Sequence, residues 1–144
     1  MKALVSVSLA ELLVQLLAAR RAIRDRIPYD TPFMNGKPEN VARDMWTVGS
    51  GLSAPWPVLA AHAAGTVLLM VRPRQGLKRA MGWLGSVYIL GILWEHASRE
   101  SFQHPDRETT PLITGGLFLS AVMATLGLRG SAKLRDRRVT TAGR

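Results

Sequence analysis

The chain contains no cysteine, so disulfide bonds, thiol catalysis, iron–sulfur clusters and cysteine-ligated zinc sites are all excluded. Acidic residues are also scarce, since 10 Asp and Glu stand against 19 Lys and Arg and leave a formal net charge of +9. The sequence holds no nucleophile elbow, P-loop, dinucleotide fingerprint or haem-ligand pattern. Because these patterns are absent, we expect no cofactor. The sequence also lacks an RNA- or DNA-binding signature, so we expect no nucleic-acid partner.

The apolar residues gather in four runs separated by charged stretches. The second run, residues 52–71, has 20 residues without a formal charge, which is enough to cross a hydrocarbon core of about 30 Å. Helices of a soluble bundle usually keep a polar face, and neither this run nor the last has a charged face. We therefore predict an all-α fold, an integral membrane four-helix bundle over residues 1–130, with spans near residues 3–19, 52–71, 78–97 and 112–128.

The charges between the runs predict the orientation of the bundle. The short loop at residues 72–79 has four cations and no acid, and the tail at residues 131–144 is also basic. The positive-inside rule places both in the cytoplasm, together with the N-terminus. The excess of Arg over Lys and the many Ala, Gly and Leu residues indicate a GC-rich bacterial genome, so we expect the inner membrane of a bacterium. Anionic lipid headgroups are the expected partners of these cations.

One cluster opposes this orientation, because four arginines follow the first run and would lie outside: Arg20, Arg21, Arg24 and Arg26. The third loop, residues 95–110, holds four acids that would lie on the same side. We expect the two outer loops to dock through these opposite charges, with lipid phosphates as the alternative partners. Because the arginines follow the first run and do not precede it, a cleaved signal peptide is not expected.

The longest segment between the runs, residues 20–51, is predicted to contain a short helix in the membrane interface. Its middle is turn-rich and holds three prolines. Pro38 suits a first helical position, so we expect a helix over residues 38–47. Its apolar stripe would comprise Val41, Met45 and Trp46.

Small residues recur at helical spacing within the runs and predict where helices touch. The fourth, third and second runs each carry such a set: Gly116, Ser120, Ala124 and Gly127; Gly82, Gly85 and Ser86; Ala61 and Gly65. These stripes are typical of close packing, either within one bundle or between copies in a homo-oligomer or larger membrane complex.

The most informative residue is Glu11, a carboxylate near the middle of the first run. A charge at bilayer depth costs roughly 2.5–3.5 kcal/mol on insertion scales, so an intramembrane acid is a functional candidate. Ser8 and Gln15 share its helical face, and His62 lies near the midpoint of the second run with Thr66 one turn away. Glu11 and His62 are thus a candidate polar pair, acting as a proton relay or acid–base couple, or as a hydrogen-bonded contact between helices.

A weaker pattern follows the third run. His96, Glu100 and His104 are spaced i, i+4 and i+8, and would share one face if the helix continued. Such a face could present a metal ion to water, whereas the alternative is a solvated, charged helix end. The spacing is looser than H-E-x-x-H, and Pro105 favours a break.

Three functions remain open. The favoured hypothesis is a non-catalytic accessory, assembly or stabilising component, because no strong catalytic motif is present.

The second hypothesis is a small proton-coupled transporter. A four-span chain with Ala10-Glu11 in its first run resembles the small multidrug resistance transporters, which implies that Glu11 binds protons and substrate. That resemblance covers about ten residues, and the loop at 20–51 is far longer than in that family. The third is an intramembrane acid–base enzyme acting on a lipid-like substrate through Glu11 and His62, or Glu95 and His96.

Overall fold

Helices account for 73% of residues 1–129, the part of the chain that the computed structural model describes, and the fold is all-α. The basic tail predicted at residues 131–144 lies outside the described residues. In chain order the elements are α1 (Lys2–Arg24), β1 (Asp30–Thr31), β2 (Met34–Asn35), the 3-10 helix η1 (Pro38–Asn40), α2 (Val41–Asp44), α3 (Trp56–Val71), α4 (Gln75–Trp94), α5 (His96–Gln103) and α6 (Thr109–Leu128).

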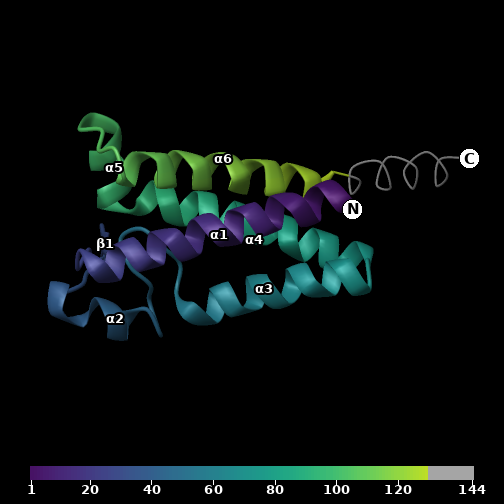
Figure 1. Ribbon diagram of the computed structural model, residues 1–144, viewed down its shortest axis with the longest axis horizontal. Coiled ribbons are helices and arrows are strands. Elements are labelled where there is room, and N and C mark those ends of the chain that lie inside the picture. The colour runs from purple at the N-terminus through teal and green to yellow at the C-terminus, as the bar shows by residue number, and fades with distance from the viewer. Residues whose placement is uncertain (130–144) are drawn as a thin grey trace, which may run out of the picture.

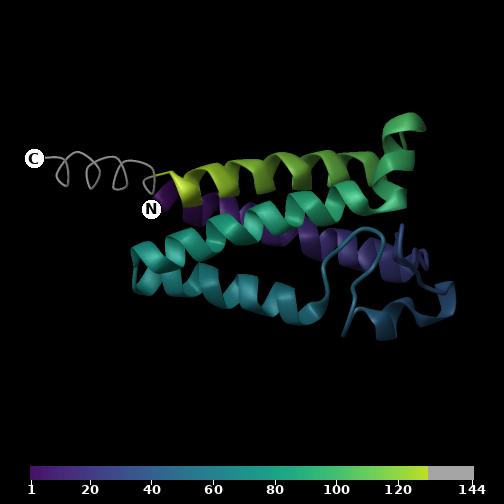
Figure 2. The same cartoon turned by 180° about the vertical axis from the view of Figure 1, so that it is seen from behind.

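The four long helices α1, α3, α4 and α6 run alongside one another and form a bundle, which confirms the predicted helical bundle (Figure 1). One end of the bundle bears the hairpin, α2 and α5, and we call it the capped end. The opposite end bears the N-terminus, the turn between α3 and α4, and the last residues of α6, and we call it the cationic end. Figure 2 shows the same division from behind.

All four long helices differ from the predicted runs at one end or both. Helix α1 continues past residue 19 to Arg24, and α6 begins at Thr109 in place of residue 112. The helix expected from residue 52 begins at Trp56, because Pro55 is extended (φ −66°, ψ 154°) and serves as the N-cap. The helix expected over residues 78–97 begins at Gln75 and ends at Trp94, because Glu95 is extended (φ −70°, ψ 133°) and separates α4 from α5. The last two errors arise where one residue leaves the helical region within an otherwise helical pattern.

The small-residue stripes of α4 and α6 face each other within the chain. A Cβ atom added at Gly85 would lie 2.7 Å from the Ser120 carbonyl oxygen and 2.8 Å from the Ala124 nitrogen. Near the cationic end, Gly82 and Gly127 bring their backbones into direct contact. These stripes are therefore intramolecular contact faces, and only residues without a side chain permit so close an approach.

The first loop contains less helix than expected. It forms the short hairpin β1–β2, with Asp30 opposite Asn35, before η1 begins at Pro38 as predicted. The helix expected over residues 38–47 ends at Asp44, and the chain then turns through Gly49, which has a φ of +97°.

The apolar stripe predicted for this helix is also only partly right. Val41 and Met45 are buried, whereas Trp46 is 67% exposed. Trp46 points away because the helix has ended, and the Met45 carbonyl accepts a hydrogen bond of 2.7 Å from the backbone N–H of Trp56. The start of α3 is thus held against the end of the first loop.

Two of the described helices, α1 and α6, have the length and apolar composition needed to cross a membrane. Only 33% and 28% of their apolar stretches are buried within the protein, whereas the core helix of a soluble protein is mostly buried. Helix α3 is apolar but has 16 residues.

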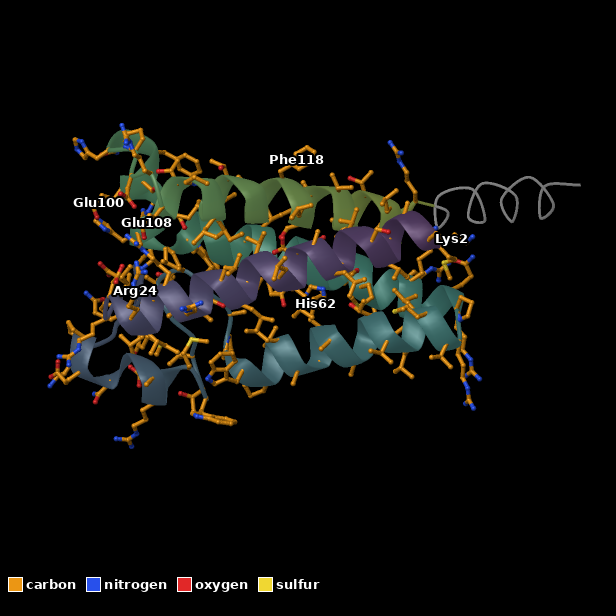
Figure 3. All side chains as sticks on the ribbon, in the orientation of Figure 1. Lys2, Arg24, His62, Glu100, Glu108 and Phe118 are labelled. Atoms are coloured by element: carbon orange, nitrogen blue, oxygen red, sulfur yellow. The ribbon has the colours of Figure 1, made fainter. Side chains whose placement is uncertain are left out.

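The charged residues divide unequally between the two ends, and Figure 3 shows Lys2 at one end and Arg24, Glu100 and Glu108 gathered at the other. Within residues 1–129 the cationic end has six cations and no acid: Lys2, Arg72, Arg74, Lys78, Arg79 and Arg129. The capped end has eight cations and eight acids: Arg20, Arg21, Arg24, Arg26, Lys37, Arg43, Arg99 and Arg107 against Asp25, Asp30, Glu39, Asp44, Glu95, Glu100, Asp106 and Glu108. Glu11, the remaining described acid, lies between the ends.

Candidate functional site

Polar side chains are buried in the middle of the bundle, within a core that is otherwise apolar, while large apolar side chains cover its outside. Six polar side chains in its middle are at most 3% exposed: Ser8, Glu11, Gln15, His62, Thr66 and Ser120. Large apolar side chains of the same helices are exposed: Leu9, Leu13, Leu16 and Leu17 of α1, Val67, Leu68, Met70 and Val71 of α3, Trp83, Val87, Leu90, Leu93 and Trp94 of α4, and Phe118 of α6. Figure 3 shows Phe118 directed away from the bundle and His62 directed from α3 toward α1.

Glu11 is held between α1 and α6. Its Oε1 accepts hydrogen bonds from Gln15 Nε2 at 3.0 Å and from Ser120 Oγ at 2.9 Å. A Cβ atom at Gly116 would lie 3.9 Å from Oε1, so two small residues of α6 leave the room that the carboxyl occupies. The Oε2 atom has no hydrogen-bond partner, and within residues 1–129 no ion pair reaches Glu11.

Gln15 connects this carboxyl to the loop before α3. Its amide donates to Glu11, while its Oε1 accepts from the backbone N–H of Ala54 at 3.3 Å. Ser53 Oγ donates to the backbone carbonyl of Gln15 at 3.0 Å. Residues 52–55 are therefore tied to α1, which positions the first turn of α3 against the polar interior.

His62 is fully buried and bonds to Tyr88 of α4. Its Nδ1 lies 3.1 Å from the Tyr88 hydroxyl, and the two ring centroids are 5.5 Å apart. Among residues 1–129, His62 Nε2 has no hydrogen-bond partner, and neither does Oε2 of Glu11. No hydrogen bond joins Glu11 to His62 within the described residues, so each member of the predicted pair has its own partners.

The hydroxyls of Ser8 and Thr66 also have partners inside the bundle, one on another helix and one within α3. Ser8 Oγ donates to the sulfur of Met123 at 3.3 Å, and Thr66 Oγ1 donates to the His62 carbonyl at 2.9 Å. These bonds satisfy buried hydroxyls inside the bundle, where water is excluded. As it stands, the polar interior is a set of contacts between helices.

A cavity of about 190 Å³ lies beside this interior, toward the capped end. It is bounded by α1, the loop before α3, α4 and the first turns of α6, and most of its lining is apolar. Gln15 and Tyr88 line it, but Glu11 and His62 do not. The cavity thus reaches the hydrogen-bond partners of the two titratable groups and stops short of the groups themselves.

Glu95 is the acid that lines this cavity. It directly follows the last residue of α4, and its Oε2 accepts a hydrogen bond of 3.0 Å from the Asp30 backbone N–H of the hairpin. Burial raises the pKa of the Glu95 carboxyl, while the bond from Asp30 opposes that shift. Arg99 is the nearest favourable charge, yet no ion pair joins it to Glu95.

The three residues suggested for a metal do not gather around one point. His96 Nδ1 lies 3.8 Å from a Glu100 carboxylate oxygen, whereas His104 follows the last residue of α5. No group of three or more His, Asp or Glu side chains within residues 1–129 is placed to hold a metal ion. The shared face required α5 to continue through residue 104, and the helix ends at Gln103.

The arginines after the first run form ion pairs with acids of the third loop, which confirms the predicted docking. Arg21 pairs with Asp106 at 3.4 Å and with Glu108, and Arg24 pairs with Glu108 at 2.9 Å. Hydrogen bonds from the side chain and backbone of Thr109 lower the pKa of Asp106. Two of the four arginines, Arg21 and Arg24, thus pair with acids of the same protein.

Sequence reasoning missed Tyr88 as the partner of His62 and counted Ser120 only as a small residue. Tyr88 carried a usable signal, because a hydroxyl in the middle of an apolar run needs a hydrogen-bond partner. Its pairing with His62 depends on how α3 and α4 pack, which spacing alone does not give.

Comparison of the chain with protein-family models, with curated proteins and with solved structures finds no match in any of the three.

Proposed function

We propose that this chain is an integral membrane protein in which α1, α3, α4 and α6 all cross the bilayer. The observation that carries the proposal is the apolar exterior of the bundle, together with the ionisable and polar side chains buried at its centre. Its buried centre holds a carboxyl, an imidazole and an amide, while leucine, valine and tryptophan side chains cover its outside. Water would penalise such an exterior, whereas hydrocarbon accepts it and requires polar groups to face inward.

The proposed orientation places the cationic end in the cytoplasm of a bacterial cell, with the capped end on the other side of the inner membrane. Six cations without an acid at one end suit the positive-inside rule and anionic headgroups. The ion pairs of Arg21 and Arg24 support the location of the capped end outside, since they give the opposing arginines protein partners.

Within the membrane we propose a non-catalytic, accessory or stabilising role. An enzyme or transporter that uses Glu11 needs a route by which substrate or protons reach it. Glu11 and His62 are both 0% exposed, and neither lines the cavity. Their partners come from three different helices, which favours a structural role as contacts within the bundle.

Single cysteines test the membrane location, because the native chain has none. Phe118→Cys places a thiol at a site that is 67% exposed on the middle of α6. We expect it to resist a water-soluble maleimide in native membranes and to react once the membrane is dissolved in a mild detergent and the protein unfolded. Rapid labelling in membranes would overturn the proposal.

Two control positions give the orientation. Arg74→Cys lies in the turn between α3 and α4, and Phe33→Cys lies in the hairpin loop, where the side chain is 82% exposed. In intact cells an impermeant maleimide should label position 33 and spare position 74, and inverted vesicles should reverse this pattern. Labelling of both from one side would exclude four spans.

A further inference from the structure

The cavity beside the polar interior has properties of a ligand site that the accessory role does not use. We propose that it binds a single-chain amphipathic amine from the membrane, with the chain against α4 and the cationic head beside Glu95. This inference rests on the proposed membrane location, which the cysteine experiment tests separately.

The cavity opens on the surface that would face lipid. Val87 and Gly91 of α4 both line it and are exposed, Val87 to 57%. Across from them lie Pro55 and Val58 at the start of α3. Helices α3 and α4 meet at their turn and separate toward the capped end (Figure 1), so the opening lies where the two helices are apart. A molecule dissolved in the bilayer can enter from the side.

The lining changes character along α4 in a way that fits an amphipathic occupant. Val87, Gly91 and Glu95 are each one turn apart and all line the cavity, and they span about 12 Å along the helix axis. The first two present apolar surface, and the last presents a carboxylate just beyond the end of the helix. A chain lying along this face therefore meets an acid at its outer end.

The charge near that end favours a cation over an anion or a neutral head. Glu95 uses Oε2 for the Asp30 backbone N–H and has no ion pair within the described residues. Asp30 adds a second acid next to it, and Arg99 is the cation that opposes them. An ammonium group would form a charge-assisted hydrogen bond with Glu95, which is stronger than a bond between neutral groups.

The size of the cavity limits the occupant to a slender molecule. At about 190 Å³ it exceeds the cavity of about 150 Å³ that admits benzene in an engineered protein core. It is smaller than pockets of about 300 Å³ and above that enclose drug-sized ligands. One alkyl chain with a compact head fits this volume, and a two-chain phospholipid does not.

A photoreactive probe tests the site on the full-length protein in membranes of neutral lipid. The probe is n-octylamine with a diazirine in its chain, competed with unlabelled n-octylamine, n-octanol or n-octanoate. We expect saturable crosslinking to residues 48–58 and 87–95, and competition by the amine about tenfold or more stronger than by the alcohol or the acid. Crosslinks spread evenly over exposed α1, α3 and α6 would overturn the site.

Three variants distinguish the contribution of the cavity's shape to binding from the contribution of the Glu95 charge. Glu95→Gln keeps an oxygen for the Asp30 N–H and removes the charge, so it should weaken amine binding about tenfold and leave octanol binding unchanged. Gly91→Leu should abolish binding of every probe, because a side chain there enters open space in the cavity. Gly115→Leu is its matched control, because a Cβ there also meets no atom within 4 Å and Gly115 does not line this cavity. Equal amine binding by wild type and Glu95→Gln would refute the cationic head.

Discussion

The two ends of the bundle are held together by opposite means. At the cationic end, Gly82 and Gly127 let α4 and α6 touch through their backbones, and none of the acids within residues 1–129 lies beside the six cations. At the capped end the helices separate, loops and α5 fill the space, and ion pairs join segments more than 80 residues apart. The packing of the cationic end depends on glycines, which have no side chain, whereas the capped end depends on contacts between side chains. A tight end and an open end within one bundle explain why the cavity lined by Glu95 lies toward the capped end.

The largest expected effect comes from breaking the close contact of α4 with α6. In Gly85→Leu the new Cβ would meet backbone atoms of Ser120 and Ala124 at 2.7–2.8 Å, and neither can rotate away. We expect destabilisation of about 3 kcal/mol, the upper part of the range for overpacking. Denaturant unfolding in detergent measures it, with Gly115→Leu as the control. Equal stability of both variants would show that the helices are not so close.

A second effect, in the middle of the bundle, concerns Glu11. Glu11→Ala leaves the Gln15 amide and the Ser120 hydroxyl without their shared acceptor, and should cost about 1–3 kcal/mol. Glu11→Gln keeps an acceptor oxygen and should fold nearly as well as wild type. If Glu11→Gln is stable yet abolishes a proton-linked activity of the protein, the transporter hypothesis replaces the structural role.

A third effect concerns the hydrogen bond between His62 and Tyr88, which lies on the side of the bundle where α3 and α4 begin to separate. His62→Phe and Tyr88→Phe should each destabilise the fold, and the double variant should lose about 1 kcal/mol less than the sum. A double-mutant cycle measured by thermal unfolding gives this coupling. Additive losses would mean that the bond contributes nothing.

The smallest effect is expected at the capped end. Because the pKa of Asp106 is lowered in the folded protein, its contribution to stability is present above its unfolded pKa of about 3.9 and is lost as pH falls toward the folded value. Unfolding at pH 6 and pH 3 should therefore differ less in Asp106→Asn than in wild type.

Salt provides the matching control, since these side chains are exposed. High ionic strength should weaken the Arg21 and Arg24 pairs and leave the Gly85 contact unchanged. If the free energy of unfolding changes with neither pH nor salt, the ion pairs do not stabilise the capped end.

The sequence predicted the helices well and their ends poorly. Apolar runs identified four long helices, and small residues identified the faces of α4 and α6 that touch. The ends depended on the extended backbone of Pro55 and Glu95. Hydrogen bonds at these places join segments distant in sequence, from Ser53 to the Gln15 carbonyl and from the Asp30 N–H to the Glu95 side chain. Similarly, Glu11 and His62 stood out as polar residues in apolar runs, but their partners Ser120 and Tyr88 became visible only once helices distant in sequence were packed together.

The amide of Gln15 has a consequence for the length of the first loop. It faces a carboxyl on one side and a backbone N–H on the other, so the register of the chain at Ala54 is fixed relative to α1. Residues added at the hairpin tip, between Thr31 and Met34, would extend into solvent and leave this register intact. One residue added between Ala54 and Trp56 would rotate α3 by about 100° and turn His62 away from Tyr88. Variation in loop length is therefore tolerated on one side of Ala54 and forbidden on the other.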